Sequence, residues 1–292
     1  MSLEVFLPPN LPELWGLLHR KPEALAYNGG TDLLIKIRAG LFQPTSLICL
    51  ERIQELKVVE EREGRIFLGG GASISQLLSE PLVQDHLPVL ARALRVLGSP
   101  PIRHMATLAG NIVTASPAGD SLPPLYCLEA DVVLISPRGA RTVNIKDFIT
   151  GPGKTELKKN ELVHGLLVDQ PRGCNIQHFE KLGQRNALAI SVVSLAAMIW
   201  ESDSGEVEDA RLAWGSVGPT VIRSEKVENY LIGRRLDKET LEKAASLARE
   251  EVRPIEDPRA SAWYRREVAG NLVLRLLTSE KKTRADERAG EI

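Results

Sequence analysis

The segment "ATLAGNIVTASPAGD", residues 106–120, is the most informative stretch of this sequence. It contains two glycines, one proline and three hydroxyl side chains, but its single charged residue is Asp120. Glycines let successive backbone N–H groups point into one concavity, and a helix start adds partial positive charge. Such a segment can bind a diphosphate without any Lys or Arg, and Asp120 can accept hydrogen bonds from sugar-like hydroxyls.

A second segment of this kind, "NGGTDLL" at residues 28–34, leads directly into a predicted helix. Its glycines also stand beside amide and hydroxyl side chains. Taken alone, each of the two segments is equally well explained as a tight turn between a strand and a helix.

Two other glycine segments do not fit phosphate-binding motifs. "GPGKT", residues 151–155, has Phe148 where GxxxxGK[ST] requires its first glycine, which favours a solvated turn. "GGG", residues 69–71, does not continue as GxGxxG and predicts a strand-to-helix turn, so the usual dinucleotide fold is not supported.

The composition excludes several classes of protein. A formal net charge of −1 over 292 residues argues against a nucleic-acid-binding surface. The longest apolar runs, such as "SVVSLAAMIW", are too short to span a membrane, and "MSLEVFLPPN" lacks the features of a signal peptide. Cys49, Cys127 and Cys174 form no CxxC pair, which favours isolated buried thiols in a reducing cytoplasm, and the scattered histidines predict no metal site.

Hydrophobic patterning predicts a mixture of strands and helices with a change of character near residue 173. Before that point, short strands alternate with helices, capped by Asn10, by Thr31 or Asp32, and by Ser73, and a hairpin turns at residues 137–139. The predicted strands are 4–8, 25–28, 45–50, 65–69, 131–136, 140–145 and 161–169, and the helices are 10–20, 31–40, 73–79 and 86–98.

The remaining chain predicts a small antiparallel sheet covered by helices. Its strands are 175–182, 187–200 and 206–217, and its helices are 224–233, 237–252 and 261–277. We therefore expect domains at residues 1–173 and 174–280. The charged tail, residues 281–292, has almost nothing to bury and is expected to be disordered.

Together and in this order, the two glycine segments resemble those of the FAD-binding (medium) subunit of the molybdenum hydroxylases. This family includes the xanthine dehydrogenase and carbon monoxide dehydrogenase flavoprotein subunits. The first segment matches its "AGGTDLL"-like element, and the second its "T-I-G-G-N-I…A-S-P-x-x-D" element. "FEKLGQRNALAISVVSLAA", "GSVGPTVIRSEKVENYLIG" and "SAWYRREVAGNLVLRLL" resemble its C-terminal signatures, so the likeness covers nearly the whole chain.

The resemblance implies an α+β fold with FAD as cofactor. A PCMH-type FAD-binding domain of two α/β subdomains would precede a small C-terminal domain of antiparallel sheet plus helices. Asp120 would bond the ribityl chain or a neighbouring hydroxyl, and Lys181 would approach the isoalloxazine. The other implied FAD contacts are Ala26, Tyr27, Asn28, Gly29, Gly30, Thr31, Asp32, Leu33, Thr107, Leu108, Ala109, Gly110, Asn111 and Ser116, with Leu97 and Val163 near the flavin or adenine.

Two residues depart from the family pattern. Asn28 stands where Ala or Gly is usual, and Ala109 stands where the family has Gly. If position 109 requires a positive φ, its alanine costs about 1–2 kcal/mol. A cost of that size would weaken FAD binding about tenfold without abolishing it, and FAD would then be retained weakly during purification.

The resemblance also implies a division of labour among subunits. A molybdopterin large subunit would oxidise the substrate, a [2Fe-2S] small subunit would relay electrons, and this flavin subunit would pass them to NAD+, a quinone or another acceptor. The assembly would be a dimer of heterotrimers, and this chain would hold no metal ligand and no catalytic residue of its own. Two alternatives stay open: a free-standing FAD oxidase or reductase of the same fold, and a flavin-free structural subunit.

Overall fold

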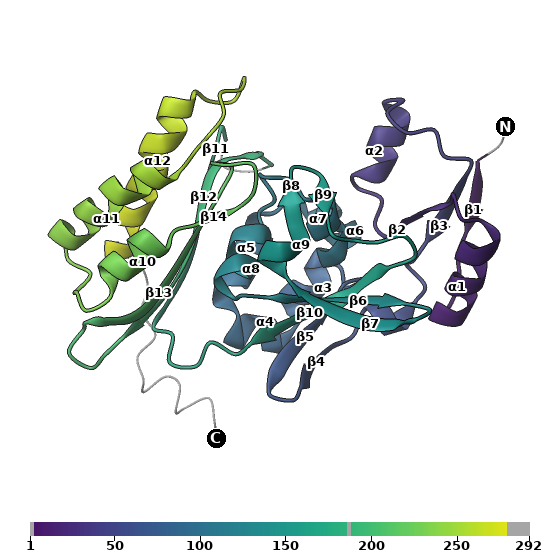
Figure 1. The fold of residues 1–292 in the computed structure, drawn as a ribbon, viewed down its shortest axis with the longest axis horizontal. Coiled ribbons are helices and arrows are strands. Elements are labelled where there is room, and N and C mark those ends of the chain that lie inside the picture. Colours follow the sequence, from purple (N-terminus) through teal and green to yellow (C-terminus); the bar gives the residue numbers. More distant parts are fainter. Residues whose placement is uncertain (1–2, 186–187, 279–292) are drawn as a thin grey trace. The chain divides into compact units, whose positions relative to one another are not determined.

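The computed structural model describes residues 3–185 and 188–278, which form two compact units (Figure 1). The first comprises 3–82, Gly98–Ala115 and Ala130–Asp169, and the second comprises Val83–Leu97, Ser116–Glu129 and 170–278. Each unit is therefore assembled from three separate pieces of chain. The expected boundary near residue 173 divides the sequence and stays a prediction, and the expected disordered tail lies outside the described residues.

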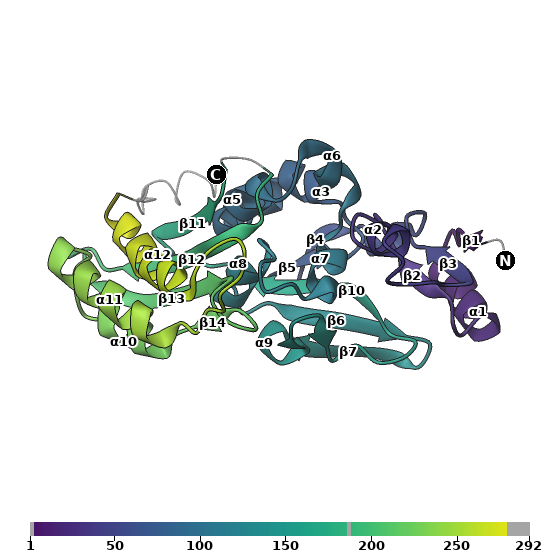
Figure 2. The same ribbon diagram turned by 90° about the horizontal axis from the view of Figure 1, so that it is seen from above.

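The N-terminal part of the first unit is a parallel sheet with the strand order β1-β3-β2 and two helices (Figure 2). Asn10 caps the first helix as predicted, because its side chain accepts the Glu13 N–H at 2.9 Å. Asp32 occupies the N-cap position of the second helix, but its side chain makes no capping hydrogen bond, so the predicted cap is wrong there. The elements are β1 (Glu4–Phe6), α1 (Leu11–Arg20), β2 (Leu25–Tyr27), α2 (Leu33–Arg38) and β3 (Ser46–Cys49).

The rest of the first unit is built on a five-stranded antiparallel sheet with the order β4-β5-β10-β6-β7. The predicted hairpin at residues 137–139 is confirmed as the β6–β7 connection. The strands are β4 (Val59–Arg62), β5 (Arg65–Gly69), β6 (Asp131–Ser136), β7 (Gly139–Asn144) and β10 (Leu162–Asp169). Short elements complete the unit: η1 (Gln54–Leu56), α3 (Ile74–Ser79), α6 (Pro100–Met105), α7 (Leu108–Thr114), α9 (Ile145–Phe148), β8 (Ile149–Gly151) and β9 (Lys154–Thr155).

The "GGG" segment forms the turn from β5 to α3, and Ser73 caps that helix, both as predicted. Its glycines are required because neighbouring backbone atoms leave no room for a side chain. A Cβ at Gly69 would lie 2.6 Å from the Leu56 carbonyl oxygen, and one at Gly70 would lie 2.7 Å from the Val163 carbonyl oxygen. Backbone segments that are distant in sequence therefore converge at this turn.

The second unit has three layers around an antiparallel sheet with the order β11-β12-β13-β14. Helices α10, α11 and α12 cover one face, and α5 and α8 pack on the other (Figure 1). The strands are β11 (Ile176–Gly183), β12 (Ser191–Glu201), β13 (Val207–Gly215) and β14 (Ile222–Arg223). The helices are α4 (Pro81–His86, which begins in the first unit), α5 (Pro88–Val96), α8 (Leu122–Cys127), α10 (Glu225–Leu231), α11 (Lys238–Glu251), α12 (Ala262–Leu274) and η2 (Arg275–Thr278).

Strand β12 begins later than the sequence predicts. The expected start, Ala187, lies outside the described residues, and Leu188 has a φ of 57°, which is incompatible with an extended strand. The strand therefore starts at Ser191.

Candidate cofactor-binding site

The loop between β2 and α2 depends on two adjacent glycines. A Cβ at Gly29 would lie 1.7 Å from the Met105 carbonyl oxygen, so only glycine permits this approach to the end of α6. Gly30 has a φ of 67°, the left-handed region that other residues rarely adopt. The loop is therefore held tightly against the segment that precedes α7.

This tight loop leaves backbone donors available. Among the described residues, the N–H groups of Gly29, Gly30 and Thr31 donate to no other group of the chain. Unpaired N–H groups in a turn form an anion-binding concavity. The first glycine segment can thus supply backbone donors to a phosphate.

The second glycine segment is a helix rather than a loop. Thr107 caps α7 by accepting the Gly110 N–H on its hydroxyl at 3.3 Å, and its carbonyl accepts the Asn111 N–H at 3.0 Å. The Ala109 N–H donates to the Gly70 carbonyl at 3.0 Å. These three amides therefore bond within the chain and are not available to a ligand.

The condition for backbone strain at Ala109 is not met. Ala109 lies in the first turn of α7 and is not among the described residues with positive φ. The residue in the left-handed region is Ala115, with a φ of 46°, where α7 ends. An alanine at position 109 therefore carries no backbone penalty.

The two segments line one cavity of about 450 Å³ within the first unit. Among the predicted residues, 26–33 and Thr107, Gly110 and Asn111 line this cavity. Leu108 is fully buried, and Leu108, Ala109 and Val163 do not line it. The sequence missed the remaining lining residues, which are Lys36, Phe42, Ala106, Val113, Thr114 and Gly153.

Two of the missed residues had a signal in the sequence. Lys36 stands four residues after Asp32, so both side chains lie on the same side of α2. Gly153 belongs to "GPGKT", which is a turn as predicted: its φ is 67°, and its N–H donates to the Ala115 carbonyl at 3.0 Å. This turn borders the cavity without being a phosphate loop.

Four predicted residues lie in the second unit, where a buried ion pair organises them. Lys181 Nζ donates to Asp120 Oδ2 at 2.6 Å and to the Val96 carbonyl at 3.3 Å, directly before Leu97. Ser116 accepts the Ala118 N–H at 3.3 Å and so shapes the turn that leads to Asp120. The Lys181 and Asp120 side chains are only 9% and 8% exposed, so water screens this pair little.

The Asp120 carboxylate has an unused acceptor. Within the described residues, its Oδ1 is buried and has no hydrogen-bond partner. Burial raises the pKa of Asp120 to about 6, although the charge of Lys181 and its hydrogen bond act in the opposite direction. Burying a hydrogen-bond acceptor without a donor costs free energy of folding. The unused Oδ1 therefore points to a hydroxyl or N–H group of a ligand at this position.

The sheet register explains why these residues gather. Lys181 on β11 pairs with Ser194 on β12, and Ser194 pairs with Gly215 on β13. A Cβ at Gly215 would lie 3.0 Å from Pro123 Cγ in α8 and 3.8 Å from the Pro117 carbonyl oxygen, so α8 and the chain that precedes it lie on this face. Asp120, within that chain, therefore reaches Lys181.

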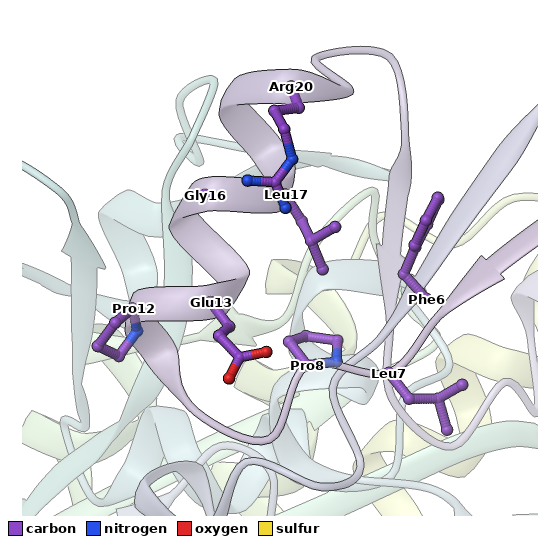
Figure 3. Close-up of a pocket in the computed structure, with 8 residues that line it drawn as sticks. All are labelled: Phe6, Leu7, Pro8, Pro12, Glu13, Gly16, Leu17 and Arg20. Carbon is purple, nitrogen blue, oxygen red and sulfur yellow. The ribbon is translucent and has the colours of Figure 1, made fainter.

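A second cavity of the first unit, of about 530 Å³, lies between β1 and α1 (Figure 3). Its lining combines apolar side chains with Glu13 and Arg20. None of the predicted cofactor residues lines it, so we assign it no part in the site.

Within the first unit, the backbone amides and the side chains of Thr107 and Asn111 that line the cavity suit the diphosphate of a cofactor such as FAD. Within the second unit, the buried Asp120 Oδ1 suits a polyol hydroxyl. Among the described residues, no group of three or more His, Cys, Asp or Glu side chains could hold a metal ion. In the same residues, no helix is long and apolar enough to cross a membrane.

Comparisons with known proteins agree with this assignment. Residues 1–169 match the family described as "FAD binding domain in molybdopterin dehydrogenase", and residues 178–279 match the "CO dehydrogenase flavoprotein C-terminal domain". The chain is 32% identical to the nicotinate dehydrogenase FAD-subunit of Eubacterium barkeri, over 91% of this chain and 92% of that one. It is also 32% identical to the xanthine dehydrogenase FAD-binding subunit of Escherichia coli O157:H7, over 87% and 88%.

A solved structure of carbon monoxide dehydrogenase from Hydrogenophaga pseudoflava contains a chain of the same fold. The TM-score is 0.89 at 30% identity, covering 96% of this chain and 97% of that chain. The protein therefore belongs to the class of FAD-binding oxidoreductase subunits with an α+β fold. Within that class, the chain belongs to the family of FAD-binding domains in molybdopterin dehydrogenases.

Proposed function

We propose that this chain is the electron-transferring flavin subunit of a larger complex. It would receive electrons from a [2Fe-2S] small subunit after a molybdopterin large subunit has oxidised the substrate. It would pass them to NAD+, a quinone or another acceptor. The proposal is supported by its family and by relatives that are called FAD-subunits and medium chains.

We further propose residue roles for FAD binding. The free N–H groups of Gly29, Gly30 and Thr31 hold the diphosphate, and the side chains of Thr107 and Asn111 complete that site. Asp120 accepts a hydroxyl of the cofactor on Oδ1, and Lys181 interacts with the isoalloxazine. The diphosphate role is carried by the unused backbone donors on the wall of the cavity, and the role of Asp120 by its unused buried Oδ1.

Bound FAD would supply the ability to exchange electrons singly or in pairs. The residues of this chain bind and orient the cofactor. The Lys181 ammonium fixes Asp120 Oδ2, which leaves Oδ1 in a constant position for a donor. The chain thus contributes positioning and electrostatics.

The decisive test is flavin reduction by an organic substrate. The purified chain, reconstituted with FAD, should stay oxidised with aromatic or purine substrates and become reduced only after the iron–sulfur and molybdopterin subunits are added. Reduction of the isolated chain would replace this proposal with the free-standing oxidase alternative. The flavin-free alternative rested on possible backbone strain at Ala109. Ala109 is unstrained, so that reason for the alternative does not apply.

The assembly is part of the same proposal. Co-expression with both partner subunits should yield a dimer of heterotrimers, which the mass in solution measures. We also place the complex in the cytoplasm, in accord with the buried thiols of Cys49, Cys127 and Cys174.

A further inference from the structure

The wall of the cavity contains a charge pair that the glycine segments alone did not suggest. Lys36 Nζ lies 2.6 Å from Asp32 Oδ2, and both residues line the cavity. Asp32 Oδ2 also accepts the Thr114 hydroxyl at 3.4 Å, which links α2 to α7. Among the described lining residues, Lys36 is the only cation and Asp32 the only anion.

This pair creates an electrostatic problem for an anionic ligand. A diphosphate in the cavity brings negative charge close to the Asp32 carboxylate, and like charges repel strongly where water is partly excluded. The backbone N–H groups of Gly29–Thr31 donate hydrogen bonds but carry no net charge. A cation on the cavity wall offsets part of this repulsion.

We propose that Lys36 is the counter-ion of the bound diphosphate, and that Asp32 holds its ammonium at the cavity wall before the ligand arrives. Asp32 is then a positioning residue and not a ligand. Its side chain does not cap α2, and its Oδ2 is shared between Lys36 and the Thr114 hydroxyl. The inference rests on the proposed diphosphate site and adds a charged side chain to a site otherwise built from neutral donors.

Lys36 should contribute only modestly to the free energy of diphosphate binding, because its side chain is 38% exposed and salt can screen its charge. We expect Lys36→Gln to weaken binding of FAD about three- to tenfold, as for a partly exposed ion pair. ADP carries the diphosphate without the flavin and should show the same loss. Asp32→Asn removes a repulsive charge but also the group that holds Lys36, so its effect on the binding of both should be smaller than that of Lys36→Gln.

The experiment is a calorimetric titration of the full chain with FAD and with ADP, at low and at high salt. The matched control is Lys238→Gln, which breaks a similar i,i+4 pair with Glu242 on α11, outside the cavity. The control should bind like the wild type, and the salt dependence should flatten only in Lys36→Gln.

Three outcomes separate the possibilities. Unchanged affinity and salt dependence in Lys36→Gln, with wild-type FAD binding intact, overturns the counter-ion role alone. A larger loss in Asp32→Asn than in Lys36→Gln overturns it too, because Asp32 would then be the ligand. A wild type that binds neither FAD nor ADP overturns the proposed diphosphate site and this inference together.

Discussion

Gly29 and Gly30 are adjacent in the sequence, but different forces require them. A side chain at position 29 collides with the backbone carbonyl of Met105, and no rotamer change can relieve that contact. At position 30, glycine is favoured because φ is 67° and because a Cβ would contact the flexible side chain of Leu34. The sequence indicated that both glycines matter for the cofactor segment. It could not show why Gly29 is required, because Met105 is distant in the chain.

Substitution separates these two reasons. Gly29→Ala should lower the free energy of unfolding by about 3–5 kcal/mol, the range of severe backbone and packing disruptions. Gly30→Ala should cost about 1–2 kcal/mol, the penalty for a left-handed alanine. Gly40→Ala is the matched control, because Gly40 has a φ of 75° and open space around it. Urea denaturation measures all three, and equal losses at positions 29 and 40 would contradict the contact with Met105.

Ala109 allows a test of the family pattern. Restoring the family residue by Ala109→Gly should leave FAD affinity unchanged and cost about 0.5–1 kcal/mol of stability, because glycine is a poorer helix former. FAD titration and thermal unfolding of the two proteins measure both effects. Tighter FAD binding by the glycine variant would show that position 109 limits the site after all.

Asp120 should make the free energy of unfolding of the FAD-free protein depend on pH. Its pKa is about 6 in the fold against 3.8 for the ordinary group, so the folded protein takes up the proton first. This carboxyl therefore makes the protein more stable as pH falls from about 6 to about 4, and its contribution is constant below that window. The wild type should gain about 2 kcal/mol relative to Asp120→Asn between pH of about 7 and about 4.

The measurement is the urea midpoint of both proteins across this pH range. Other carboxyls, such as Asp257 with its lowered pKa, titrate in both proteins, so their effects cancel in the difference. A difference that does not change with pH would contradict the raised pKa of Asp120.

At the scale of elements, the long periodic helices, the main strands and the short helices α2 and α3 followed from the sequence, whereas the short helices α6, α7 and α8 did not. Helices α6 and α8 have six residues each, and both carry proline in the first turn. Six residues are too few to show a helical period, and a proline resembles a breaker although it is tolerated at a helix start. Helix α7 was mistaken for a loop because its glycine and hydroxyl residues are typical of turns.

Strand β12 makes an element-scale prediction. Ten of its eleven residues are buried, because α10–α12 cover one face of its sheet and α5 and α8 cover the other. A fragment of residues 174–280 contains only the first set of helices. Expressed alone, it should bind a hydrophobic dye and lack a cooperative thermal transition, whereas the full chain should show a cooperative transition and little dye binding.

Circular dichroism and dye fluorescence measure both properties. Cooperative unfolding of the fragment without dye binding would show that α5 and α8 are dispensable for this sheet. The same fragment is also a test of the expected boundary near residue 173.

At the scale of the whole molecule, the mode of FAD attachment can be predicted. Neither set of residues that we assign to FAD, the lining of the cavity or the Lys181–Asp120 pair, contains a Cys or His nucleophile for a covalent link to the flavin. FAD should therefore be released completely when the reconstituted protein is precipitated with acid. Yellow colour that stays with the precipitated chain would contradict non-covalent binding.

The sequence by itself determined the family, the cofactor and most residues that line the cavity. It could do so because close backbone approaches, left-handed turns and helix caps require particular residue types. Those residue types form motifs that can be recognised in the sequence. Only the tertiary structure decided which backbone amides are free, that Lys36 joins the cavity, and that Lys181 meets Asp120. These depend on hydrogen bonds and ion pairs between segments far apart in the chain, and such pairings leave no local pattern in a single sequence.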